Sequence, residues 1–138
     1  MCTETCSNFN YLAILVASLA YFALGSVWYS PLLFGSAWQK LVNITMKPEK
    51  SEMIRLFSTT FVLGAVSMFV LEYFIKSTAC VTAGGGIGIG LISAIGYVAT
   101  TIGTTFMYEG KPMKLYLIDT SYHVAGFLIG GAIMGAWQ

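Results

Sequence analysis

Residues 10–30, NYLAILVASLAYFALGSVWYS, form the stretch that decides the fold. They contain no Asp, Glu, Lys, Arg or His, and the charge-free run around them extends from Glu4 to Lys40. A bilayer core about 30 Å thick is crossed by an α-helix of roughly 20 apolar residues. The stretch is therefore predicted to cross a membrane as one helix.

Three further stretches are almost free of charge. Residues 56–71 and 77–108 contain no charged residue, and residues 115–138 contain only Asp119 and His123 among acidic and basic residues. A helical bundle in water would carry charges at helical spacing on its outer faces, and these stretches do not. The sequence therefore predicts an all-α integral membrane protein, a bundle of four transmembrane helices. The spans are expected near residues 10–30, 55–76, 83–107 and 115–137.

The composition of the whole chain supports the same class. Of 138 residues, 57% are hydrophobic and 9% are charged, whereas an average globular domain has roughly 25% charged residues. This length suits one domain, so residues 1–138 are expected to form a single transmembrane domain surrounded by the lipid bilayer. Seven Lys and Arg against six Asp and Glu give a net charge of +1, which leaves no basic surface for nucleic acid.

The basic residues predict the orientation of the helices. Except for Lys76, they lie in the connections after the first and third spans or, in the case of Arg55, at the start of the second span, and such basic regions usually stay in the cytoplasm. We therefore expect both termini on the exoplasmic side and both basic loops on the cytoplasmic side. No basic residue precedes the first span, so we expect this span to be retained rather than removed as a secretory signal.

The segment after the first span is rich in aromatic residues. Pro31 is expected to end or kink the helix. Trp28, Tyr29 and Trp38 belong to residue types favoured at the headgroup level, so these four residues are expected to anchor the chain at the membrane interface. The anchor takes one of two forms: a short interfacial helix near residues 32–42, or an irregular segment.

This segment also carries a resemblance. The run AYFALGSVWYSP at residues 20–31, followed by LFG at 33–35 and AW at 37–38, resembles the start of the DUF1761 family of small membrane proteins. The C-terminal half is similar to the family as well, in its Gly-rich third span and in the run GGAIMGAW at residues 130–137. The Gly-x-x-Trp-Tyr-Ser-Pro element is the most specific part. The resemblance implies a four-helix membrane fold with no assigned activity.

Asp119 and His123 are the strongest candidates for a proton or solute site. Their spacing of four residues places them on one face of the fourth helix, and ionisable residues inside a membrane often mark such sites. Thr104 of the third span could add a hydroxyl to a polar path. The alternative is structural. Asp119 would favour the positive end of its helix and pair with Lys111 or Lys114, and His123 would form a hydrogen bond to another helix.

Glycine recurs at intervals of four residues in the third and fourth spans. Small residues at this spacing allow helix backbones to approach closely in a membrane. We expect Gly86 and Gly90 to pack against Gly126 and Gly130, and the remaining glycines to face a second copy or a partner. A phosphate-binding loop at residues 84–90 is excluded because no strand precedes it and no Lys-Ser/Thr follows.

No pattern of catalytic residues is present in the sequence. The single histidine and Cys2, Cys6 and Cys80 lack the spacing of a zinc site, and no nucleophile motif occurs. We therefore expect no enzyme, no cofactor and no metal. The leading hypothesis is a helix-packing module that forms a homo-oligomer or serves as an accessory subunit of a larger membrane complex. The alternative is a small oligomeric transporter or channel for protons or small solutes, which would use Asp119 and His123.

Overall fold

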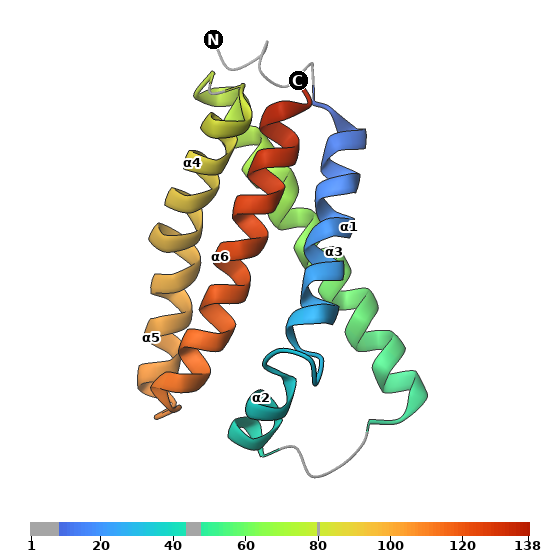
Figure 1. Cartoon of the computed structure of the whole chain (residues 1–138), viewed down its shortest axis with the longest axis vertical. Helices are drawn as coiled ribbons and strands as arrows, with labels where there is room; N and C mark the ends of the chain where they lie inside the picture. Colours follow the sequence, from blue (N-terminus) through green and yellow to red (C-terminus); the bar gives the residue numbers. More distant parts are fainter. Residues whose placement is uncertain (1–8, 44–47, 80) are drawn as a thin grey trace.

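The computed structural model describes residues 9–43, 48–79 and 81–138, and these residues form helices and no strand. Four long helical units run between the two ends of the molecule (Figure 1). Each of them is long and apolar enough to cross a membrane, which confirms the predicted all-α bundle of four membrane helices. Cys2, Cys6 and Cys80 lie outside the described ranges.

The helical units correspond closely to the predicted spans. The first and fourth are α1 (Tyr11–Trp28) and α6 (Met113–Ala136). The second is α3 (Lys50–Ser77). The third is continuous but changes its winding: α4 (Ala83–Ser93) and α5 (Thr100–Tyr108) are joined by a π-helical segment, η1 (Ala94–Ala99). A short helix, α2 (Gly35–Val42), follows α1, within the range predicted for it.

The second unit begins earlier than the charge pattern indicated. The expected start was residue 55, whereas α3 begins at Lys50. The reason is a capping box, in which the side chains of Glu49 and Glu52 accept hydrogen bonds from each other's backbone N–H groups. The helix therefore starts among charged residues, outside the apolar stretch.

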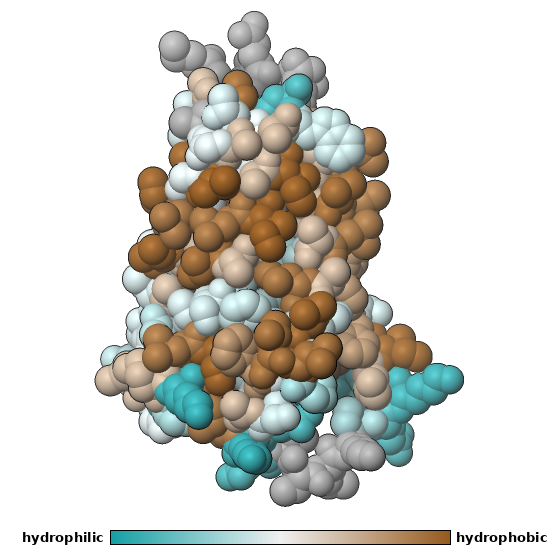
Figure 2. Space-filling model, viewed as in Figure 1, coloured by the Kyte–Doolittle hydropathy of each residue, from teal (hydrophilic) through white to brown (hydrophobic). Residues whose placement is uncertain are grey.

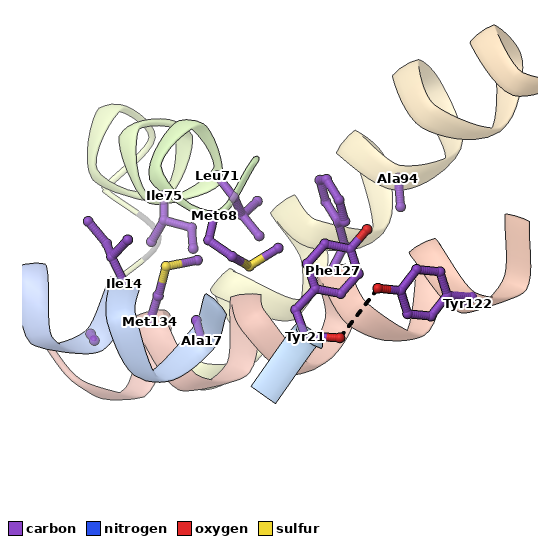
Figure 3. Packing of buried hydrophobic residues seen from close by; sticks show 11 residues of the cluster. Ile14, Ala17, Tyr21, Met68, Leu71, Ile75, Ala94, Tyr122, Phe127 and Met134 are labelled. Carbon is purple, nitrogen blue, oxygen red and sulfur yellow. Dashed lines mark hydrogen bonds between the residues drawn. The ribbon is translucent and has the colours of Figure 1, made fainter. Parts of the chain in front are cut away.

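The helices α4 and α6 lie side by side along their length, and α1 lies beside α6 (Figure 1). The helix α3 crosses behind α1 and diverges from the bundle toward its own N-terminus (Figure 1). Every residue from Lys50 to Thr60 is accordingly exposed. The core formed by α1, α3, α4, α6 and η1 includes Ile14, Ala17, Tyr21, Met68, Leu71, Ile75, Ala94, Tyr122, Phe127 and Met134 (Figure 3).

Glycine makes the α4–α6 contact possible. A Cβ on Gly86 would overlap the backbone of Gly131, and a Cβ on Gly90 would overlap the carbonyl group of Phe127. Backbones this close are the arrangement that small residues allow in membranes.

The prediction that Gly86 and Gly90 pack against Gly126 and Gly130 was wrong in part. Gly126 faces the ring of Tyr21 on α1, and Gly130 faces Met68 on α3, instead of facing Gly86 and Gly90. The physical reason is the helical rotation of about 100° per residue, which turns neighbouring positions of α6 toward different helices.

The outer surface matches a membrane environment. Apolar residues cover the middle of the molecule, and hydrophilic residues gather toward one end (Figure 2). This end holds α2, the start of α3 and the turn between α5 and α6 (Figure 1). We call it the basic end because it carries Lys40, Lys50, Arg55, Lys111 and Lys114. Both predicted basic connections are thus on the same side of the bundle.

A polar cluster lies toward the opposite end. Glu72 is 0% exposed, and its carboxylate lies 3.8 Å from Nζ of Lys76, one turn further along α3. The side-chain amide of Gln138 approaches the same carboxylate at 3.5 Å. Nearby, the Asn10 amide donates to the carbonyl oxygen of Trp137 at 2.6 Å. These contacts join α3 and the start of α1 to the end of α6, so we assign them a structural role.

Candidate functional site

The aromatic segment after α1 binds to α6. Oδ1 of Asp119 accepts hydrogen bonds from the Tyr29 hydroxyl at 2.9 Å and from Nε1 of Trp38 at 3.0 Å. Nε1 of Trp28 donates to the carbonyl oxygen of Ile118 at 3.1 Å. We call residues 28–38 the aromatic turn. That these residues anchor the chain at the membrane interface stays a prediction, and the structure adds that the Trp28, Tyr29 and Trp38 side chains bond to α6.

A tight backbone turn brings these aromatic side chains together. The helix α1 ends at Trp28, shortly before Pro31, and the Gly35 N–H donates to the carbonyl oxygen of Ser30 at 2.9 Å. A Cβ on Gly35 would collide with the backbone of Tyr29 and Ser30. Only glycine fits there, so the turn requires it.

Tyr122 of α6 lies at the centre of an aromatic cluster between α6 and α1. Its ring stacks on Tyr21 with centroids 5.2 Å apart and meets Tyr29 edge-on at 5.4 Å. Its hydroxyl donates to the backbone carbonyl of Tyr21 at 3.4 Å (Figure 3). A Cβ on Gly25 would lie only 3.0 Å from the Tyr122 hydroxyl, so the small residue admits this ring.

His123 is hydrogen-bonded across helices. Its Nδ1 atom and the Tyr21 hydroxyl share a hydrogen bond, which joins α6 to α1. Asp119 bonds to the aromatic turn, and in the described part of the chain no hydrogen bond connects Asp119 with His123. The two residues share a helix face, as predicted, but they have separate partners.

The splayed end of α3 leaves a cleft between α1 and α3. Its deeper part has a volume of about 170 Å³ and is lined by His123, Tyr21 and Gly64, among others. Its wider part, nearer the basic end, has a volume of about 470 Å³ and is lined by aromatic residues that include Tyr29 and Trp38. Both parts share the same three lining residues, Phe22, Thr60 and Tyr122. We call these two adjoining hollows the cleft.

The remaining predicted site residues lie elsewhere. Thr104 is exposed on α5, and its hydroxyl donates to the carbonyl oxygen of Thr100 in its own helix at 2.9 Å. Lys111 lies 2.5 Å from the carboxylate of Glu109 and above the ring of Phe106. Among the described residues, Asp119 forms no ion pair with a lysine. The expected ion pair with Lys111 or Lys114 is therefore wrong, and the Asp119 carboxylate is bonded to Tyr29 and Trp38 instead.

Sequence reasoning did not select Tyr21, Tyr122 or Thr60 for this site. A signal for the first two was present, because a tyrosine in the middle of an apolar span needs a partner for its hydroxyl. Thr60 had no such signal, because a threonine hydroxyl can be satisfied by the backbone of its own helix. The Thr60 hydroxyl is satisfied in this way by the Leu56 carbonyl. Its place in the cleft follows from the angle between α3 and α1.

The lining of the cleft is mostly apolar. Aromatic faces and aliphatic side chains form most of its lining. The Ser18 and Ser67 hydroxyls donate to carbonyl groups of their own helices, so they present little unsatisfied polarity. The imidazole of His123 is the ionisable basic group in the lining.

One known protein family matches nearly the whole chain. The family described as "Protein of unknown function (DUF1761)" matches residues 12–135, a range that includes the aromatic turn, Asp119 and His123. No match was found among curated proteins or among solved structures. The chain belongs to the DUF1761 family.

Proposed function

We propose that this multi-pass membrane protein binds a small amphipathic molecule from the bilayer in the cleft. It would act as a carrier or as the binding subunit of a larger complex, and not as an enzyme. The observation that carries the proposal is the divergence of α3 from α1, which leaves an aromatic-lined hollow of about 470 Å³. Ligand sites commonly have volumes of roughly 300–1,000 Å³ and mostly apolar linings with few polar groups.

The position of His123 supports the same proposal. Ionisable side chains inside membrane helices are costly, and they occur mainly where they line a cavity or bind a partner. His123 does both, since it lines the deeper hollow and is bonded to Tyr21. Asp119, by contrast, is engaged by two donors of the aromatic turn. A proton relay that uses both residues is therefore less well supported than a binding site beside His123.

The excess of basic residues at one end supports an orientation with this end in the cytoplasm. The cleft would then open toward the cytoplasmic leaflet, because its wider hollow lies beside Trp38 of α2. Both termini would lie on the exoplasmic side.

A second candidate function is self-association, or service as an accessory subunit. Its support is the exposure of α3 from Lys50 to Thr60, together with apolar side chains such as Ile54 and Phe57. Glycines of α4 and η1 that have open space around them, Gly84, Gly88 and Gly96, also leave room for another helix. A homo-oligomer could cover these surfaces.

A photoreactive probe tests the proposed binding site. The protein in lipid nanodiscs would be illuminated with a diazirine-substituted alkanol, and the adducts would be mapped by mass spectrometry. We expect adducts on Tyr122 or His123. Gly64→Leu should remove them, because a Cβ on Gly64 makes ordinary contact with Tyr21 at 3.4 Å while the larger side chain fills the hollow.

The matched control is Gly88→Leu, where a Cβ meets nothing within 4 Å. This variant should keep the adducts in the cleft. Adducts spread evenly over the lipid-facing helices, or unaffected by Gly64→Leu, would overturn the proposal.

A further inference from the structure

We infer that the molecule bound in the cleft is an anionic membrane lipid, with its phosphate-bearing headgroup near Arg55 and one acyl chain along α3. The inference rests on the proposed function and specifies the class of ligand. Its evidence is the path of hollows along α3, the charge at the mouth of that path, and the character of its lining.

A third hollow adjoins the cleft at the charged start of α3. This hollow, of about 490 Å³, is lined by Arg55, Glu52 and Leu56, among others. Leu56 also lines the wider hollow of the cleft, and Thr60 lines both the wider and the deeper hollow. The three hollows therefore follow one another along α3, from the one at Arg55 to the one that reaches Ser67.

The length of this path fits one acyl chain. A helix rises 1.5 Å per residue, so the distance along α3 from Arg55 to Ser67 is about 18 Å. One leaflet of a hydrocarbon core about 30 Å thick measures about 15 Å. A chain that enters at Arg55 would thus end in the deeper hollow, beside Gly64.

The charge at the mouth favours an anionic headgroup. Glu52 lines the same hollow as Arg55, and its carboxylate accepts a hydrogen bond from the backbone N–H of Glu49 at 3.2 Å in the capping box of α3. This carboxylate therefore bonds to the start of its own helix rather than to Arg55. Among the ion pairs of the described residues, none includes Arg55. A guanidinium group without a carboxylate partner at the membrane surface attracts phosphate, to which it can donate two parallel hydrogen bonds.

The lining favours a hydrocarbon chain over a polar solute. The hydroxyl of Thr60 donates to the Leu56 carbonyl at 2.6 Å, and that of Ser67 donates to the Leu63 carbonyl at 3.1 Å. These donors are therefore occupied within α3. The methyl, methylene and aromatic groups that remain exposed in the cleft match an acyl chain, which needs no hydrogen bonds.

The experiment compares lipids retained by the protein. Native mass spectrometry would be applied to the full chain released from nanodiscs of phosphatidylcholine and phosphatidylglycerol in equal amounts. We expect phosphatidylglycerol to be enriched on the wild-type protein. Arg55→Gln should lower the enrichment by about fivefold, the factor expected for one cation near an anionic surface. Arg55→Lys should retain most of it.

The control for charge is Lys50→Gln, which removes the same charge from α3 at a residue that lines none of the hollows named above. It should leave the enrichment unchanged. An equal effect of Lys50→Gln and Arg55→Gln would mean general attraction to an anionic surface and would overturn the inference.

The outcomes separate this inference from the proposed function. Equal retention of both lipids, together with alkanol adducts in the cleft that Gly64→Leu removes, would overturn the lipid assignment and leave the binding site standing. Absence of both the enrichment and the adducts would overturn the two together. A dimer that persists in place of bound lipid would assign the cleft to a second copy of the chain, against the inference.

Discussion

The Tyr29 hydroxyl at the end of α1 donates a 2.9 Å hydrogen bond to the carboxylate of Asp119, 90 residues further along the chain. Trp38 donates to the same oxygen from α2. Asp119 therefore attaches the aromatic turn to α6 by two donors that come from opposite sides of a tight turn. This arrangement gives a structural role to Tyr29, which belongs to the most specific part of the family resemblance, and to Trp38, which follows that part.

Removal of this acceptor should destabilise the protein. Asp119→Ala leaves the Tyr29 and Trp38 donors without a partner in a half-buried place, and we expect a loss of about 1–3 kcal/mol in the free energy of unfolding. Asp119→Asn keeps one carbonyl oxygen and should lose less. Thermal unfolding in mild detergent, followed by circular dichroism, measures both. Ser121→Ala, whose hydroxyl bonds within α6, is the control, and equal stability of Asp119→Ala and wild type would contradict the role of Asp119.

The turn itself should depend on Gly35. In Gly35→Ala, the new methyl group would collide with the backbone of Tyr29 and Ser30, so the turn must open and move Trp38 away from Asp119. We expect α2 to detach while the four long helices persist. Accessibility of Trp38 to a water-soluble fluorescence quencher, with Trp28 and Trp137 replaced by Phe, reports this movement. Unchanged quenching in Gly35→Ala would show that the turn tolerates a side chain.

The α4–α6 contact predicts opposite effects at two nearby glycines. Gly90→Ala places a methyl group against the Phe127 carbonyl and should destabilise the fold by about 1–3 kcal/mol. Gly88→Ala meets nothing within 4 Å and should be neutral or stabilising by up to about 1 kcal/mol, because alanine is the better helix former. Unfolding of both variants under the same conditions decides the matter, and equal effects would contradict the observed packing.

The orientation can be tested through a glycosylation acceptor pattern. Asn43-Ile44-Thr45 matches this pattern. Asn43 directly follows α2 at the basic end. If the basic end faces the cytoplasm, Asn43 stays unmodified in the membrane of the endoplasmic reticulum, and a tag at either terminus is reachable from the exoplasmic side. An enzyme that removes glycans should then cause no mobility shift on a gel. A glycan on Asn43 would invert the orientation.

The sequence predicted the membrane helices well because their evidence is local. The absence of charge from residues 56–71 and 77–108 is a property of each stretch alone. The start of α3 was missed because its capping box lies among charged residues, where apolar character gives no signal. The predicted facing glycines were partly wrong because spacing identifies small residues but not the neighbouring helix toward which each one turns.

The candidate site was less predictable because it depends on contacts between distant segments. Spacing placed Asp119 and His123 on one helix face, but their partners come from the aromatic turn and from Tyr21. Nothing in the sequence states that Trp38 folds back onto α6. The cleft depends on the angle at which α3 leaves α1, and a sequence pattern does not contain that angle.

The most direct test of the account is contact between a lipid chain and His123. The protein would be deuterated except for its histidine and tyrosine rings, embedded in nanodiscs of protonated phosphatidylglycerol, and studied by nuclear Overhauser measurements. We predict transfer from acyl-chain protons to the rings of His123 and Tyr122, and its loss in Gly64→Leu. Transfer to exposed Tyr97, without transfer to His123 or Tyr122 in the wild-type protein, would show that the chain remains outside the cleft and would contradict the account.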